Sequence, residues 1–469
     1  MIFVGGIQVL ILLVALIRGK ALAMMLGPEG VGVIGTVDQF IITVAQVCAL
    51  GLPFAAMKSM SAAHSEGEEA FRRTFAVFAR ILVSISLVVA VVASSSEVLA
   101  HTVFSGLSEY RDVLVLALFA VPSMILTILV AQTLASAQMP KAASVYNLLF
   151  ALVLAVAALV GAALAGIWGF YFGTVLAGVA VLAAAFLWLR RKMGLGPLDR
   201  ATPVWREISG KRLVRDTAVS AYANLVSASA LLLLVRYVVL RSEGEAEVGL
   251  LQSALGVALS AGSILATLSA LYLAPSLNRK APPDKKFRSA AAFANTAALY
   301  VMLGAIPVAL FPGLVLTILY TGAFTGAAVM LILCLIWQGL SLVMTTYSHL
   351  LVGIDRPLAV TVTTLVSVAI GIAAVFILVE HWGAIAAPLA LILTVVVRAG
   401  LIAALLVAQN AMPMPWGVLA RYLFVTAAIA GAAYLFDMSV TVPDAAGFAY
   451  RALYALAVTG LMWVWNRAA

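Results

Sequence analysis

Charged side chains are scarce in this sequence: Asp, Glu, Lys and Arg make up 10% of its 469 residues, whereas 64% are hydrophobic. A soluble globular domain carries about 25% charged residues. Together with a mean hydropathy of +1.14, this shortage excludes a soluble protein. It indicates a polytopic membrane protein whose surroundings are mostly lipid.

The sequence also has little cysteine. Cys48 and Cys334 lie in separate apolar runs, so we interpret both as packing residues and exclude a disulfide framework or a cysteine metal site. A phosphate-binding loop, a nucleophile motif and metal-ligand spacings are missing as well. We therefore expect no cofactor and no use of ATP, which leaves proton or sodium coupling open as the energy source.

Long apolar runs separated by polar loops predict about fourteen transmembrane helices, each close to the ~20 residues that cross the hydrocarbon. Their approximate limits are 2–26, 33–57, 75–96, 113–137, 143–165, 167–189, 217–240, 248–275, 290–311, 325–352, 358–379, 383–408, 417–436 and 448–466. The expected fold is an all-α polytopic membrane protein.

The distribution of basic residues orients these spans. With the N-terminus in the cytoplasm, 21 of the 28 Lys and Arg residues fall in cytoplasmic loops or ends, three in periplasmic loops and four inside spans. This asymmetry follows the positive-inside rule and predicts that both termini are cytoplasmic. It also excludes nucleic acid as a partner, because the basic loops face the cytoplasmic surface of the membrane.

An internal repeat is visible at a constant offset of 217 residues. Gly32 corresponds to Gly249, Pro140 to Pro357, and Gly166 to Gly383. Two parallel six-helix halves around a central cavity are a transporter architecture. The predicted domains are an N-terminal half at 1–189, a cytoplasmic linker at 190–216, a C-terminal half at 217–408 and two additional helices at 409–469.

Two motifs carry a resemblance to a known family. They are GKALAMMLGPEGVGVIGTVDQF at 19–40 and EVGLLQSALGVALSAGSILATLSALYLAPSLNR at 247–279. The sequence resembles the MOP exporter superfamily, and within it the Wzx-type flippases of O-antigen and related polysaccharides. That resemblance implies that undecaprenyl-pyrophosphate-linked oligosaccharide moves from the cytoplasmic to the periplasmic leaflet of the bacterial inner membrane. The implied partners are this substrate, membrane lipids, a polysaccharide polymerase and chain-length proteins.

Two features depart from that branch. Twelve spans are usual there, and fourteen is similar to the lipid II flippases of the same superfamily, so a peptidoglycan lipid II flippase is the alternative. The first span also has no basic leader, so we expect the natural chain to begin upstream of Met1.

Two further functions are disfavoured. A polysaccharide polymerase or ligase would have to rely on Glu97 and His101, the only plausible acid–base pair in a periplasmic loop. A multidrug exporter binds cations and would carry several acids inside its spans.

Four cations are counted inside predicted spans, namely Arg18, Lys20, Arg236 and Arg398, whereas Asp38 is the only one of 19 acidic residues inside a span. Three further arginines near the ends of their spans are counted with the loops: Arg80, Arg421 and Arg451. Buried charges in membranes are costly and mark pathways or pairs. Lys20 and Asp38 lie about six residues on either side of the glycine-rich turn, at the same depth of two antiparallel helices. A contact of Asp38 with either Arg18 or Lys20 is therefore available.

We interpret Arg18 and Lys20 as substrate-binding residues that attract the pyrophosphate in the N-terminal half. The alternative is that one of them neutralises Asp38 and the other extends to the membrane surface. Arg236 and Arg398 are further candidates for substrate binding, although Arg236 is close enough to a span end to reach the surface. Asp38 is a candidate for ion coupling or for charge pairing.

Overall fold

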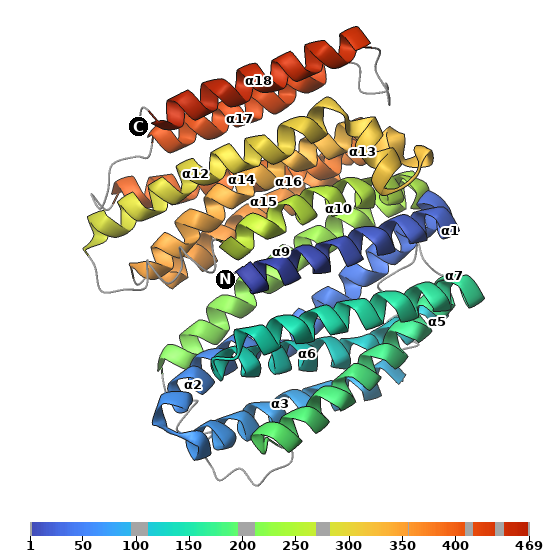
Figure 1. Ribbon diagram of the computed structural model, residues 1–469, viewed down its shortest axis with the longest axis vertical. Coiled ribbons are helices and arrows are strands. Elements are labelled where there is room, and N and C mark those ends of the chain that lie inside the picture. The colour runs from blue at the N-terminus through green and yellow to red at the C-terminus, as the bar shows by residue number, and fades with distance from the viewer. Residues whose placement is uncertain are drawn as a thin grey trace. The chain divides into compact units, whose positions relative to one another are not determined.

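The computed structural model describes residues 2–94, 111–195, 212–268, 282–354, 356–408, 416–436 and 445–467. Within these ranges the regular structure is helical, and no strand occurs (Figure 1). The N-terminal helices are α1 (Ile2–Ala49), α2 (Leu52–Glu66), α3 (Glu68–Ser94), α5 (Arg111–Leu118), α6 (Ala120–Ser136), α7 (Pro140–Met193) and α9 (Arg212–Glu243). The remaining helices are α10 (Glu245–Leu268), α12 (Pro283–Leu310), α13 (Pro312–Leu319), η3 (Gly322–Ala327), α14 (Ala328–Gly353), α15 (Pro357–Trp382), η4 (Gly383–Ile385), α16 (Ala386–Ala408), α17 (Trp416–Leu435) and α18 (Ala445–Arg467).

The described helices confirm an all-α polytopic membrane protein. Nine of their segments are long and apolar enough to cross a membrane. Three of these have 45, 54 and 49 residues, about twice the length of one crossing, and each contains a break that divides it into two arms. Two crossings for each of the three, together with α10 and α17, account for the fourteen predicted spans.

The break in α1 is tighter than the predicted turn. Gly27 has φ 66° and ψ −172°, and helical geometry resumes at Pro28. A positive φ favours glycine, and proline is well suited to the first turn of a helix because its ring presets φ and no N–H is needed there. The second arm therefore begins near residue 28 rather than 33, so one residue makes the turn.

The internal repeat recurs in the backbone. Gly27 and Gly244 both have positive φ, at 66° and 92°. Gly166 has φ 58° and ψ −142°, and Gly383, 217 residues later, has φ 54° and ψ −138°. The hydrogen bond from Met139 N to Leu134 O, at 3.0 Å, has its equivalent from Arg356 N to Leu351 O, at 2.9 Å. The two halves therefore share the same turn geometry at equivalent positions.

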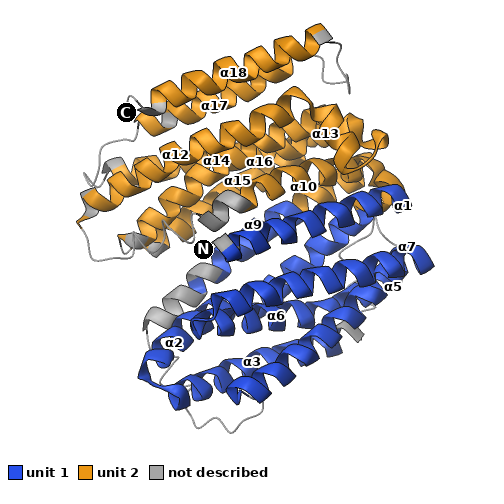
Figure 2. Ribbon diagram, viewed as in Figure 1, with its two compact units in different colours: residues 1–26, 33–233 blue, residues 27–32, 234–469 orange. Residues whose placement is uncertain are grey.

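Two compact units make up the chain (Figure 2). Unit 1 contains Met1–Leu26 and Val33–Leu233, and unit 2 contains Gly27–Gly32 and Leu234–Ala469. The division falls inside α1 and α9, because the short stretch after the α1 break packs with unit 2. The predicted limits of the two halves, the linker and the appended pair stay predictions, and most of the linker lies outside the described residues.

In unit 1, α6 packs against α7, α2 and α3, and α5 packs against α7. Large side chains that are fully buried there include Phe75, Phe78, Phe170 and Tyr171. The two arms of α7 form a hairpin. This arrangement places residues 170 and 171, just after the α7 break, in the interior of the unit.

In unit 2, α14 packs against α10, α12, α16 and α17, and the α15–α16 hairpin packs closely on itself. α17 and α18 both pack on α12. Many large apolar side chains are exposed in both units, among them Leu164 and Leu358. Exposed apolar surface of this kind is expected where lipid, not water, is the solvent.

Candidate functional site

The α1 hairpin brings Arg18 and Asp38 together in unit 1. Arg18 Nη2 donates to Asp38 Oδ2 at 3.1 Å, and their side chains are 33% and 34% exposed. The hydroxyl of Tyr171, from α7, donates to Asp38 Oδ1 at 2.9 Å and lies 3.1 Å from the carbonyl oxygen of Ile34. Of the two contacts that the sequence left open for Asp38, the structure forms the one with Arg18.

An aromatic ring holds the other side of the Arg18 guanidinium. Its central carbon lies 5.0 Å from the ring centroid of Phe170, within the range of a cation–π interaction. Arg18 is thus oriented by a carboxylate and a ring, yet a third of its side chain stays accessible. A guanidinium that is fixed and still exposed can bind an anionic ligand without first being ordered.

Lys20 is half-buried, two residues after Arg18 on the same arm of α1. Residues two apart on a helix do not share a face. The two cations therefore project from different faces of α1. A pyrophosphate bound to Arg18 would need the long side chain of Lys20 to reach around the helix.

Arg236 lies in α9 and is 3% exposed. Its Nε donates to Gln252 Oε1 of α10 at 3.0 Å. The side chain packs inside unit 2, so it does not extend to the membrane surface as the alternative interpretation required. The partner in this hydrogen bond is a neutral amide.

Arg398 lies in α16, and its Nη2 donates to Ser348 Oγ of α14 at 3.0 Å. Its Nε is buried without a hydrogen-bond partner among the described residues. An unsatisfied N–H of a charged group is costly in a buried setting, so this arginine has spare capacity to bind an acceptor.

A polar cluster in unit 1 joins α1 to α9. Gln39 Nε2 and Thr43 Oγ1 each donate to the carbonyl oxygen of Ser229 at 3.3 Å. The Ser229 hydroxyl donates to Gln46 Oε1 at 2.5 Å. These side chains are used for interhelical hydrogen bonds, the common role of polar residues in membrane helices.

Two buried arginines were counted as loop residues in the sequence. Arg421 of α17 donates to Asn295 Oδ1 of α12 at 3.2 Å and to the Trp465 carbonyl of α18 at 3.3 Å. Arg451 of α18 donates to the Leu310 carbonyl at the end of α12 and lies 5.2 Å and 5.4 Å from the ring centroids of Phe311 and Phe436.

Both arginines thus attach the α17–α18 pair to α12, one near each end of the pair. A signal was available, because residues 421 and 451 lie within the limits predicted for the last two spans. The acid–base pair Glu97 and His101, considered for an enzyme, lies outside the described residues.

Solved structures similar to this chain include a lipid II flippase and transporters of the MOP superfamily. The lipid II flippase MurJ, in an inward closed conformation, is 12% identical, with a TM-score of 0.71 over 100% of this chain and 99% of its own. A multidrug resistance MATE family transporter of the MOP superfamily, in an inward-facing conformation, is 13% identical, with a TM-score of 0.67 over 92% of this chain and 96% of its own.

A MOP superfamily transporter from Pyrococcus furiosus, whose binding pocket is described as having reversed polarity, is 14% identical, with a TM-score of 0.59. It matches over 92% of this chain and 94% of its own. The sequence matches no protein-family model and no curated protein. At these identities the likeness establishes architecture and not substrate: the chain is a multi-pass membrane protein with the fold of the MOP superfamily transporters.

Proposed function

We propose that this protein is a flippase for undecaprenyl-pyrophosphate-linked oligosaccharide, which moves an O-antigen or related unit from the cytoplasmic to the periplasmic leaflet by alternating access. The observation that carries this proposal is Arg18, an intramembrane guanidinium that is oriented by Asp38 and Phe170 and still a third exposed. We place the protein in the bacterial inner membrane with both termini cytoplasmic, and a polysaccharide polymerase and chain-length proteins are its expected partners.

Pyrophosphate suits this group chemically. A guanidinium offers a planar fork of N–H donors that matches two phosphate oxygens. In the empty protein Asp38 partly neutralises Arg18, which lowers the cost of keeping the cation inside the membrane. A pyrophosphate carries more negative charge than the Asp38 carboxylate and would compete with it for Arg18. Competition from Asp38 would in turn keep the pyrophosphate from binding too tightly to be released. We therefore assign Asp38 to charge pairing and not to ion coupling.

The charge balance also argues against a multidrug exporter. Asp38 is the only acid inside the predicted spans, whereas at least four cations lie there, and a cationic drug would be repelled by this excess. We assign Arg398, whose Nε has no hydrogen-bond partner among the residues that the structure describes, to the same class of anionic contact in unit 2. Lys20 and Arg236 stay candidates of the same kind.

The test is transport by the full chain in proteoliposomes that contain the lipid-linked oligosaccharide. A membrane-impermeant glycosidase added outside reports the fraction of substrate that reaches the outer leaflet. We expect Arg18→Gln to lower the initial rate at least ten-fold, and Arg18→Lys to restore part of it. Arg288→Gln, which removes an exposed cation at the start of α12, is the matched control and should leave the rate unchanged. Equal rates for Arg18→Gln and the control would refute the proposal.

A lipid II flippase is the second candidate, because MurJ matches over the whole length of both chains and fourteen spans occur in both our prediction and the lipid II branch. The same vesicles loaded with lipid II separate the two functions. Transport of the oligosaccharide lipid with no transport of lipid II supports the first proposal, and the reverse result supports the second.

A further inference from the structure

The two arms of α7 meet through their smallest residues. A methyl group on Gly161 would lie 2.0 Å from the carbonyl oxygen of Gly169, and one on Gly173 would lie 2.3 Å from that of Ala157. Small residues at four-residue spacing let membrane helices approach closely. Larger side chains on either side of this contact then enclose hollows between the arms.

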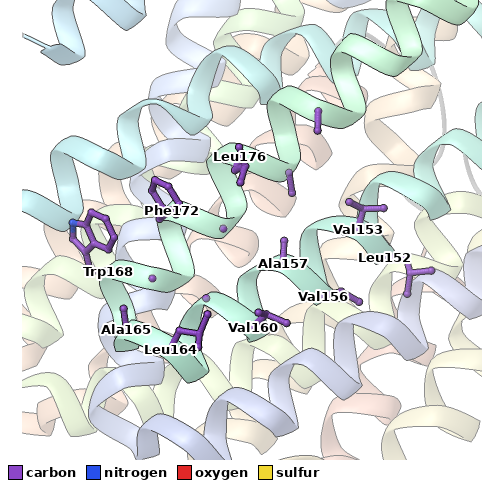
Figure 3. Close-up of a pocket in the computed structure, with 15 residues that line it drawn as sticks. Leu152, Val153, Val156, Ala157, Val160, Leu164, Ala165, Trp168, Phe172 and Leu176 are labelled. Atoms are coloured by element: carbon purple, nitrogen blue, oxygen red, sulfur yellow. The ribbon is translucent and has the colours of Figure 1, made fainter.

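The first hollow lies at the closed end of the hairpin, with a volume of about 820 Å³ (Figure 3). Its lining includes Val156, Val160 and Leu164 from one arm and Trp168, Phe172 and Leu176 from the other. The rings of Trp168 and Phe172 stack at 5.3 Å. Every lining side chain is apolar or an indole, so this hollow suits hydrocarbon and offers no group that selects a particular lipid.

The second hollow lies at the open end of the hairpin and differs in one respect. It has a volume of about 430 Å³, and apolar residues such as Leu134, Val145, Leu149 and Val181 line it. Lys141 is the one charged residue in the lining, and Trp188 stands on the opposite arm. An apolar hollow with a cation and an indole at its mouth matches a lipid with an anionic head group.

More positive charge follows within one turn of Trp188, at Arg190, Arg191 and Lys192. All three are exposed, as is Lys141, whose Nζ lies 5.9 Å from the ring centroid of Phe3. None of the four cations forms an ion pair with another residue in the part of the chain that the structure describes. Both ends of a hairpin reach the same membrane surface, so these cations gather at the open end.

We infer that the open end of the α7 hairpin is a binding site for an anionic phospholipid. One acyl chain occupies the hollow beneath Lys141, and the phosphate contacts Lys141 and the basic residues 190–192. Charge complementarity selects this occupant, because a zwitterionic lipid would give the four cations no net attraction. The site does not depend on the proposed function, since it uses none of the intramembrane charges assigned to the substrate.

The test measures phosphatidylglycerol binding to the purified full chain by native mass spectrometry, with phosphatidylcholine as the reference lipid. Lys141→Gln should weaken phosphatidylglycerol binding about five-fold, the value of one cation near a lipid phosphate. Lys141→Arg should restore it. Ala185→Trp fills the hollow without a change of charge and should lower the retention of phosphatidylglycerol and of phosphatidylcholine alike.

The matched control is Lys285→Gln, an exposed lysine near the start of α12, which should leave phosphatidylglycerol binding unchanged. Thermal melting of each variant verifies that it is folded. Unchanged binding in Lys141→Gln, or equal losses in Lys141→Gln and the control, would overturn the assignment. So would displacement of phosphatidylglycerol by undecaprenyl pyrophosphate at a one-to-one ratio, because the hollow would then belong to the substrate.

Discussion

The helix crossing at Gly249 gives the most direct test of the packing. A methyl group at Gly249 would lie 1.9 Å from the carbonyl oxygen of Pro28, and one at Gly32 would lie 2.2 Å from that of Glu245. Both obstacles are backbone atoms, which cannot rotate away as a side chain can. Gly249→Ala must therefore push α10 and the segment 28–32 apart by about 1 Å or more to reach an ordinary contact near 3.5 Å.

Overpacking of this kind costs about 1–3 kcal/mol. For a unit of roughly 240 residues each kcal/mol lowers the melting temperature by about 2–4 °C. We therefore expect Gly249→Ala to lower the melting temperature of the full chain in detergent by roughly 2–12 °C. Fluorescence-detected size-exclusion chromatography after heating measures it.

Gly304→Ala is the matched control, since a methyl group at this helical glycine meets nothing within 4 Å. Alanine is favoured over glycine in a helix by about 0.5–1 kcal/mol, so this variant should melt at the same temperature or slightly higher. Equal melting temperatures for Gly249→Ala and Gly304→Ala would refute the close crossing.

Three further changes test other contacts. Arg18→Asp and Asp38→Arg should each reduce transport and stability. If the ion pair at 3.1 Å stabilises the protein, the double exchange should recover part of both. No recovery would argue that the two residues have separate roles. Arg451→Met removes the donor to the Leu310 carbonyl and should destabilise the protein by about 1–3 kcal/mol. Arg288→Met, at an exposed position, is the control, and equal melting temperatures of the two variants would contradict the attachment of α18 to α12. The predicted topology is tested in a chain with Cys48 and Cys334 replaced by serine. In right-side-out vesicles His381→Cys should react with an impermeant maleimide, whereas Arg191→Cys should react only after permeabilisation. The opposite pattern of labelling would contradict the predicted topology.

Hydropathy and glycine placement made the helices predictable. An apolar run of about 20 residues can satisfy its backbone in lipid only as a helix, so each predicted span has a helical counterpart. The equivalence of Gly166 and Gly383 was also visible, because the positive φ at both turns favours glycine. The limits of the helices differ from the predicted ones: α3 begins at Glu68, earlier than residue 75, because polar residues can extend a helix beyond the hydrocarbon.

The contacts of the charged residues were only partly predictable. Spacing around the turn placed Lys20 at the same depth as Asp38 and left a contact with either Arg18 or Lys20 available. In the structure Arg18 pairs with Asp38, Phe170 lies against Arg18 and Tyr171 donates to Asp38; both aromatic residues are more than 130 residues away along the chain. Arg421 and Arg451 were counted with the loops although they lie within the limits predicted for the last two spans. Their contacts with α12 arise only in the folded unit.

The sequence by itself determined that this protein is surrounded by lipid, that it is helical, that it contains a repeat and that it has few intramembrane acids. These properties follow from composition and local periodicity. The tertiary structure decided that Arg18 pairs with Asp38, that Arg236 is buried against Gln252, and where α7 leaves a hollow beside Lys141. Those outcomes depend on distances between helices that are remote in the chain, and such distances are set by packing, which no local pattern records.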